Sequence, residues 1–221
     1  MNQPEAAGGG RERLIQAALR LASRTRSLTH LGIRELAREA DLNPNTFYRH
    51  FGTIEDLGLA AISVVAAELK PLLHLLQETA AHQKPEHMFR QVAEGYFAFA
   101  SAHPEAILLG LAELHGSSSV LRQALEQLLD DLADQMTSDA ISLQLAPGID
   151  AATLREISGQ IVVWFFQAAG RVVEYPDQRA ALTSAGENLA RRLYLAAISE
   201  ANPLTGLLGA LKLRPKKTVP T

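Results

Sequence analysis

Apolar side chains recur along this chain mainly with the three-to-four-residue period of an α-helix. Between residues 11 and 24, for example, Leu14, Ala18 and Leu21 fall on one helical face. No stretch alternates apolar and polar residues as a half-buried strand does, and no repeat of solenoid length occurs. We therefore expect an all-α protein of about nine helices. The expected helices cover residues 11–24, 33–40, 44–50, 54–81, 86–102, 104–115, 120–145, 151–173 and 177–201.

Local signals sharpen several of these boundaries. Pro44 stands where proline is favoured, in the first helical turn, and Asn43 before it is a suitable N-cap. Thr53 can cap the next helix, which has acidic residues in its first turn. Pro71 lies inside that helix and is expected to kink or divide it, because proline cannot donate the backbone hydrogen bond.

Composition narrows the class of protein. The 221 residues include no cysteine, which excludes disulfides and thiolate metal sites. The first ten residues lack the apolar run of a signal peptide, and the longest apolar stretch, Ile161–Phe166, is shorter than the roughly 20 residues that span a bilayer. We expect a soluble, cytoplasmic protein without a membrane partner. No catalytic or metal-binding motif such as H-E-x-x-H is present, so we expect no enzyme activity, cofactor or metal.

Charge is distributed unevenly. The whole chain has a net charge of -3, but residues 1–53 contain eight basic and five acidic residues, whereas the remainder is acidic. A basic front on an acidic body is expected when only one module meets phosphate, although so small an excess can arise by chance.

Residues 33–51 form the most informative segment, IRELAREADLNPNTFYRHF. Two short helices joined by a tight turn constitute a helix-turn-helix. Phe47 and Phe51 are expected to point inward, while the second helix presents an unusual density of hydrogen-bonding side chains. Such side chains can read base edges or bind phosphate, whereas an ordinary surface helix is also polar.

The segment 33–57, IRELAREADLNPNTFYRHFGTIEDL, resembles the DNA-binding signature of TetR-family repressors. The resemblance implies an N-terminal three-helix helix-turn-helix domain followed by a helical ligand-binding and dimerisation domain. It also implies that Asn43, Asn45 and Thr46 contact bases or nearby phosphate. By the same resemblance Tyr48 and His50 hold the DNA backbone, and Arg34 and Arg49 flank them.

Three positions depart from the family pattern. Asp41 replaces the usual glycine of the turn, and Gly32 replaces the usual Ser or Thr cap of the second helix. The phosphate contact of that cap is then lost or moves to Thr29 or His30. Thr53-Ile54 replaces an Asn-Lys pair, so DNA affinity is expected to depend more on Arg34 and Arg49.

Within the family, the chain is most similar to the repressors of unsaturated fatty-acid synthesis and desaturation, which sense acyl-CoA. The similar stretches are residues 43–60 and 99–125. In those repressors the helix after an Asn-Pro pair is rich in arginine, which suits the phosphates of CoA. Here the corresponding residues 106–115 read AILLGLAELH, without arginine. We therefore expect the effector to be acyl-CoA, a free fatty acid or another small apolar compound.

These considerations predict four parts: a disordered tail (1–10), a helix-turn-helix domain (11–53), a ligand-binding and dimerisation domain (54–202), and a flexible basic tail (203–221). Aromatic and leucine side chains at helical spacing are candidate ligand contacts, although an ordinary core shows the same pattern. The candidate ligand-binding residues are Phe89, Tyr96, Phe97, Leu108, Leu111, Trp164 and Phe165. The last two long helices resemble the family's dimer interface, for which the candidates are Ile157, Ile161, Trp164, Ala168, Leu182, Leu189 and Leu193.

The expected function is that of a homodimeric repressor of lipid-metabolism genes that binds a palindromic operator in double-stranded DNA. Ligand would shift the population between two spacings of the reading heads, with helix 54–81 as the lever. One alternative is a repressor of an efflux or degradation gene that senses an unrelated apolar compound. A more distant one is a helical adaptor that does not bind DNA.

Overall fold

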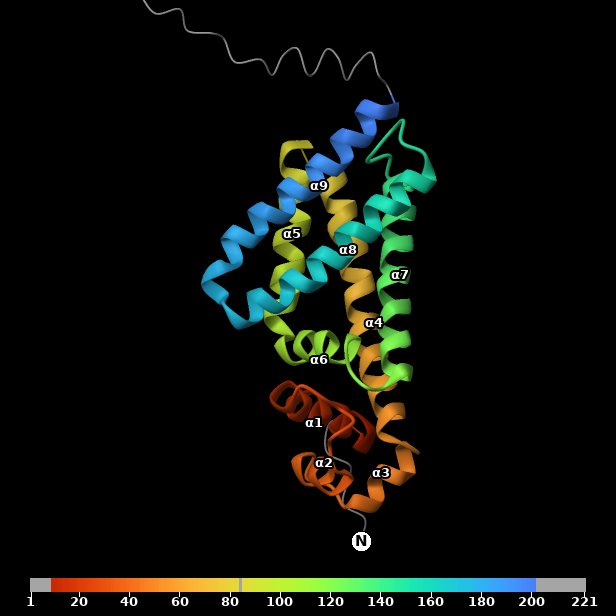
Figure 1. Cartoon of the computed structure of the whole chain (residues 1–221), viewed down its shortest axis with the longest axis vertical. Coiled ribbons are helices and arrows are strands. Elements are labelled where there is room, and N and C mark those ends of the chain that lie inside the picture. Colours follow the sequence, from red (N-terminus) through yellow and green to blue (C-terminus); the bar gives the residue numbers. More distant parts are fainter. Residues whose placement is uncertain (1–8, 84, 202–221) are drawn as a thin grey trace, which may run out of the picture.

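The computed structural model describes residues 9–83 and 85–201, and every regular element in this part is helical (Figure 1). Nine α-helices and one short 3-10 helix, Pro176–Gln178, follow one another in the described ranges, which confirms the predicted all-α class. The α-helices are α1 (Gly10–Thr25), α2 (Ile33–Glu39), α3 (Pro44–His50), α4 (Ile54–Ala81), α5 (Pro85–Ala102), α6 (Pro104–Leu114), α7 (Ser119–Ser142), α8 (Ala151–Glu174) and α9 (Arg179–Ala201).

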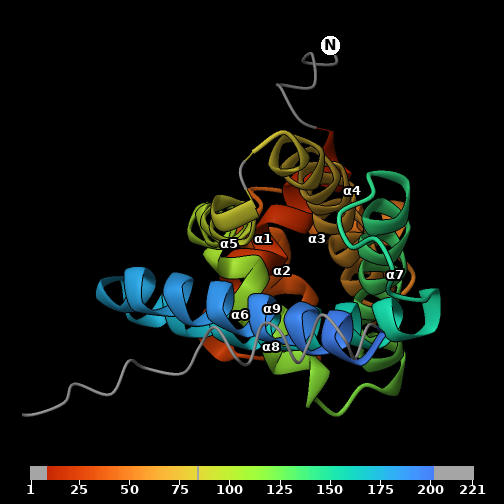
Figure 2. The ribbon, with the colours of Figure 1, turned by 90° about the horizontal axis from the view of Figure 1, so that it is seen from above.

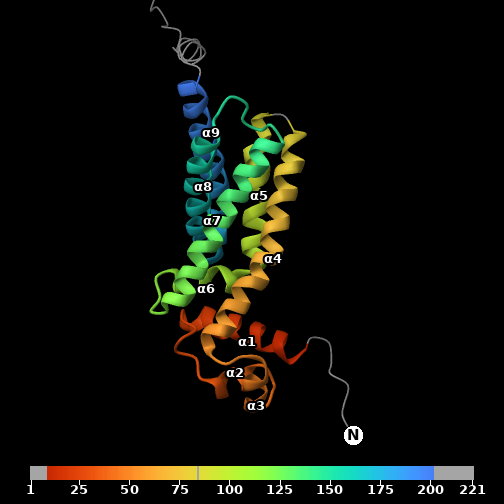
Figure 3. The same ribbon diagram turned by 90° about the vertical axis from the view of Figure 1, so that its right-hand side faces the viewer.

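The helices form two modules stacked end to end. Helices α1, α2 and α3 lie together at one end of an elongated molecule, and α4 leads from that end into the body (Figures 1 and 3). In the body, α4 packs against α5 and α7, whereas α8 packs against α7 and α9. Seen from above, α8 and α9 run side by side along one flank of the body (Figure 2). Helix α6 packs against both α1 and α8, so it lies where the two modules meet.

Most helix ends agree with the sequence prediction to within two residues. Helix α7 ends at Ser142, earlier than expected, because Gln144 adopts a left-handed φ of 54° that no helix continues through. Helix α9 starts at Arg179 because the preceding Pro176–Gln178 forms the 3-10 turn. Helix α1 begins at Gly10, at the end of the segment expected to be disordered; the rest of that tail, apart from Gly9, and the predicted tail 203–221 lie outside the described residues.

The sequence predicted a kink or a division at Pro71, and a division is wrong. Helix α4 continues through this residue without interruption over its 28 residues. Proline removes one backbone hydrogen bond from the helix. That loss is small beside the apolar packing of α4 against α5 and α7 on both sides of the proline.

Two apolar cores stabilise the modules. The N-terminal core joins α1, α2 and α3 to the first turns of α4, and it also takes in Leu109 from α6 and Leu121 from α7. The body core is formed by α4, α5, α7, α8 and α9, together with Ile107 of α6. The N-terminal core therefore extends past the boundary expected at residue 53 and is physically continuous with the body through α6 and α7.

Helix α4 is also long and apolar enough to cross a membrane by length and composition. In this fold some of its apolar residues pack in the two cores. Leu57 and Ala61 are buried in the N-terminal core, and Leu69 and Leu73 are buried in the body core. These contacts account for only part of the hydropathy of α4, because 17% of its apolar 18-residue window is buried. A single apolar helix is weak evidence for a membrane span.

Candidate DNA-reading helix and apolar cavity

Helix α3 is built by a cap at one end and aromatic packing beneath. The side chain of Asn43 accepts a hydrogen bond from the backbone N–H of Asn45 at 2.9 Å, and Pro44 begins the helix. Phe47 is completely buried and Phe51 nearly so, with their ring centroids 5.9 Å apart. These two rings fix which face of α3 points inward, as the sequence predicted. The opposite face is left to solvent.

The outward face of α3 carries the side chains expected to bind DNA. Tyr48 is 64% exposed, a large fraction for an aromatic residue. Thr46 is half-buried. The remaining predicted DNA contacts are exposed: Arg34, Asn43, Asn45, Arg49 and His50.

The start of α1 approaches this helix closely. A Cβ atom added at Gly10 would lie 3.1 Å from Nε2 of His50 and 3.2 Å from Cγ2 of Thr46. The guanidinium of Arg11 lies over the ring of Phe51, 5.6 Å from its centroid. The basic beginning of α1 therefore borders the same surface as α3.

The departure at Asp41 has a structural explanation. Its backbone φ of 52° lies in the left-handed region that favours glycine, but aspartate tolerates it better than most residues. Arg13 from α1 donates to the backbone oxygen of Asp41 at 2.8 Å and to its carboxylate at 3.1 Å. The turn between α2 and α3 is thus anchored to α1 despite the missing glycine.

The departure at Gly32 leaves α2 without a side-chain cap. Of the two residues that could replace its phosphate contact, His30 is exposed. Thr29 instead lies within hydrogen-bonding distance of Ser27, at 3.0 Å, and of Ser117 before α7, at 3.4 Å. Thr29 thus already has polar partners, one of them in the body, and His30 is the better placed of the two for DNA.

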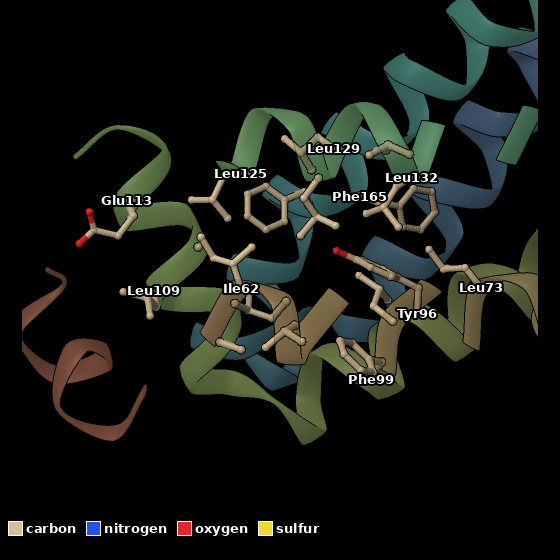
Figure 4. Close-up of a pocket in the computed structure, with 18 of the residues that line it drawn as sticks. Ile62, Leu73, Tyr96, Phe99, Leu109, Glu113, Leu125, Leu129, Leu132 and Phe165 are labelled. Carbon is tan, nitrogen blue, oxygen red and sulfur yellow. The ribbon is translucent and has the colours of Figure 1, made fainter. Parts of the chain in front are cut away.

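A long apolar cavity occupies the body and reaches the N-terminal module (Figure 4). Its lining includes α4 residues from Ala61 to Leu73, which span roughly 18 Å at 1.5 Å per residue. Its volume is about 100 Å³, which is small compared with ligand pockets of roughly 300–1,000 Å³. A larger ligand therefore has to push the lining helices apart.

The predicted ligand residues fall into four groups. Tyr96 and Phe165 line the cavity, with ring centroids 5.6 Å apart. Leu108 and Leu111 line a separate, more polar pocket between the end of α1, α6 and α8. Phe97 is buried beside the cavity against Phe165. The remaining two line neither pocket: the ring of Phe89 contacts that of Tyr194 of α9, and the ring of Trp164 contacts that of Phe165.

Glu113 is the feature that sequence reasoning missed. This carboxylate is 2% exposed and lines the end of the cavity nearest the N-terminal module. Its Oε1 accepts a hydrogen bond from the backbone N–H of Leu28 at 2.6 Å, while its Oε2 is buried and has no partner among the described residues. The available signal was one acidic residue in the otherwise apolar helix at 106–114.

Other contacts join the modules around Glu113. Arg26 at the end of α1 forms an ion pair with Glu174 of α8, and Ser118 before α7 donates to Glu55 at the start of α4. At Gly58, an added Cβ would come within 2.6 Å of Leu121 in α7. The junction is therefore tightly packed as well as hydrogen-bonded, and movement of α6 or α7 has to disturb the N-terminal module.

The predicted dimer residues lie mostly inside a single chain. Trp164, Leu189 and Leu193 are half-buried. The other four are buried in the body core: Ile157, Ile161, Ala168 and Leu182. The large apolar side chains that are exposed on these two helices are instead Val163 on α8 and Leu195 and Ile198 on α9.

Residues 14–61 match the family model described as bacterial regulatory proteins, tetR family. This range covers most of α1, all of α2 and α3, and the beginning of α4. The N-terminal module is therefore a TetR-family N-terminal domain, as its sequence resemblance implied.

Solved structures share the fold over most of the chain. The fatty acid degradation regulator FadR from Bacillus halodurans is 15% identical, with a TM-score of 0.65 over 86% of this chain and 97% of that one. FadR from Bacillus subtilis, in complex with stearoyl-CoA, is 17% identical, with a TM-score of 0.60 over 82% and 95%. NemR of E. coli in its reduced form is 15% identical, with a TM-score of 0.63 over 81% and 97%. At these identities the similarity establishes a TetR-like fold.

Proposed function

Because residues 14–61 form a TetR-family N-terminal domain, we propose that this protein is a cytoplasmic transcriptional repressor whose affinity for DNA is changed by a small apolar ligand. The observation that carries the proposal is the outward face of α3. Tyr48, Arg49 and Asn45 are exposed on this helix. Helix α3 itself lies at the far end of an elongated molecule (Figure 3).

The proposed DNA contacts divide by chemistry. Asn45 and Arg49 have the donors and acceptors that read base edges in the major groove. Tyr48, Thr46, His50 and Arg34 supply donors that suit phosphate oxygens. Asn43 contributes mainly by fixing α3, because its side-chain oxygen already caps the helix.

A homodimer follows from the same proposal. Val163, Leu195 and Ile198 leave apolar surface on the outer faces of α8 and α9. A two-fold axis along this flank would pair the two helices with their copies, as in a four-helix bundle. Two α3 helices would then lie about 34–36 Å apart, one turn of DNA, and the operator would be palindromic.

The cavity supports coupling between ligand and DNA. It is lined by Leu19 and Leu28 of the N-terminal module together with Glu113 of α6, so a ligand that widens it acts directly on the junction. We infer that ligand selects a conformation in which α4 and α6 hold the reading heads at a different spacing. A long chain such as a fatty acid or an acyl-CoA is supported by the fold shared with the two FadR structures, one of them bound to stearoyl-CoA.

The second candidate is a repressor of an efflux or degradation gene that senses an unrelated apolar compound. It is favoured by the charge of the described cavity lining, in which Glu113 is the one ionisable acid and no basic side chain occurs. A fatty-acid carboxylate or a CoA phosphate would find no countercharge there. Both candidates share the DNA-binding function, so the first experiment addresses that function.

Selection of tight-binding duplexes from a random DNA library should yield a palindromic sequence. Affinity for it should fall steeply with salt, because bound phosphates release counterions. Arg49→Ala should weaken binding and lower the log–log slope by roughly 2 in the dimer if both copies of Arg49 contact phosphate, or reduce sequence preference if they contact bases. Arg90→Ala, an exposed arginine of α5, should change neither quantity. Recovery of no preferred sequence, with no salt dependence, would favour the helical adaptor.

A further inference from the structure

Two hydrogen-bonding side chains interrupt the hydrocarbon lining of the cavity. Of the described residues that line it, Glu113 and Tyr96 alone carry a strong donor or acceptor on the side chain. Figure 4 shows Glu113 at one end with its carboxylate turned away from the lining leucines, whereas the hydroxyl of Tyr96 points into the space between Leu132, Phe165 and the α4 side chains. Only Tyr96 therefore presents a polar atom to a molecule inside the cavity.

Tyr96 is a buried residue whose hydroxyl is unused. The residue is 7% exposed, and among the described residues nothing forms a hydrogen bond with its hydroxyl. Buried polar groups are nearly always hydrogen-bonded, so an unused one facing a cavity indicates a missing partner. The ring is held in place by edge-on contact with Phe165 and by Phe97, with centroids 5.6 and 5.7 Å away.

The surroundings determine what Tyr96 can bind. Burial raises the pKa of Tyr96 above its ordinary value, so the hydroxyl keeps its proton and acts as a donor. The described lining contains no cation to neutralise an anion, and the carboxylate of Glu113 disfavours one at its end. An uncharged acceptor on an otherwise apolar chain can accept from the hydroxyl and needs no countercharge. A buried carboxylate would need a countercharge that the described lining lacks.

We propose that the effector carries an uncharged carbonyl group on a hydrocarbon chain, and that the hydroxyl of Tyr96 donates a hydrogen bond to this carbonyl. The proposal rests on the proposed function of the cavity as the effector site. Ketones, esters and the thioester of an acyl-CoA share this chemistry. Tyr96 would then determine both the class of the ligand and the depth at which its chain stops.

The test uses the full chain and a set of 12-carbon probes. Dodecane, 2-dodecanone, 6-dodecanone, dodecanoate and dodecanoyl-CoA are titrated against the fluorescence of Trp164, the one tryptophan of the sequence, whose ring lies 5.1 Å from that of the cavity residue Phe165. The rise in Tm with each probe gives a second measure of binding. At least one ketone should bind roughly 3- to 10-fold more tightly than dodecane, the ratio expected for one hydrogen bond.

Tyr96→Phe removes only the hydroxyl and should abolish this advantage while leaving the affinity for dodecane within about twofold. Tyr194→Phe is the matched control, because Tyr194 is equally buried but lies on α9 outside the cavity lining, and it should preserve the advantage. A Tyr96-dependent gain for dodecanoyl-CoA would identify a thioester as the natural source, and a gain for the ketones alone would identify a free carbonyl compound.

Other results overturn the proposal at distinguishable levels. Ketones that bind no more tightly than dodecane, or whose advantage survives in Tyr96→Phe, refute the role of Tyr96 and leave the cavity as an effector site. Dodecanoate as the tightest probe refutes the uncharged class. Failure of every probe to change either the fluorescence or the Tm refutes the proposed apolar effector itself.

Discussion

Asp41 illustrates how one residue can depart from a family pattern without loss of the local fold. Its left-handed φ of 52° is a conformation that costs an ordinary L-residue about 1–2 kcal/mol, and glycine nothing of that kind. The cost is smaller for Asp and Asn, because their short side chains can form local hydrogen bonds. The contacts with Arg13 from α1 then hold the turn in place.

We expect Asp41→Ala to lower the free energy of unfolding by about 1 kcal/mol, because alanine lacks the conformational tolerance of aspartate and the carboxylate that Arg13 contacts. Asp41→Gly should be at least as stable as the original protein, since the ion pair that it loses is solvent-exposed and worth little. Urea denaturation measures both. Equal stability of the alanine variant would show that the left-handed turn is not strained.

At the junction of the modules, Glu113 accepts a hydrogen bond from the buried backbone N–H of Leu28. Glu113→Ala should lower the free energy of unfolding by about 1–3 kcal/mol, because the buried N–H of Leu28 would lose its partner. Glu113→Gln retains an oxygen in the same position and should recover most of that loss. Denaturant titration of the two variants checks the difference, and an alanine variant as stable as the glutamine one would contradict this role.

At the scale of the element, α4 determines how the two modules are joined. A capping box fixes its start: the side chain of Thr53 accepts from the N–H of Asp56 at 3.0 Å, and Asp56 accepts from the N–H of Thr53 at 2.9 Å. From there the helix enters both cores and lines the cavity. Pro71 leaves the carbonyl of Ala67 without its helical donor, which makes this turn the weakest point of a long helix.

Pro71→Ala should restore that hydrogen bond and raise the free energy of unfolding by about 1–3 kcal/mol. A stiffer α4 should also change the ratio of operator affinities measured with and without a bound 12-carbon probe. Leu75→Ala, an exposed position of the same helix, is the control and should stay within about 0.5 kcal/mol. An unchanged affinity ratio in Pro71→Ala would remove α4 bending from the mechanism.

At the scale of the whole molecule, α8 and α9 have one apolar face that is buried within the chain and another that is exposed to solvent. Their inner faces complete the body core, and their outer faces keep Val163, Leu195 and Ile198 in contact with solvent. Three large apolar side chains on one flank are compatible with the proposed pairing of two chains.

Val163→Glu combined with Leu195→Glu should convert the proposed dimer to a monomer, because charges would be buried at the interface. The monomer should bind a palindromic operator far more weakly, since it has only one reading head. Sedimentation velocity measures the first effect. Leu75→Glu, equally exposed but on α4, should leave the assembly intact; a double variant that sediments like the original chain would exclude this flank.

The sequence alone determined the helical elements of this protein and the direction of the side chains on α3. The helical period, the cap at Asn43 and the proline at the start of α3 specify the elements, because each depends on residues within a few positions of one another. The inward direction of Phe47 and Phe51 followed from the same local pattern. These features predicted the all-α fold and the exposed face of α3 from which DNA binding is proposed.

Only the tertiary structure decided which neighbour covers each face. Period identifies the residues that share a face of α8, but not that Ile157 and Ile161 pack within their own chain. Nor can it place Tyr96 in a cavity. The hydrogen bond between Glu113 and Leu28 joins residues 85 positions apart. Such a contact depends on how whole helices pack, and a local sequence pattern carries no information about that packing.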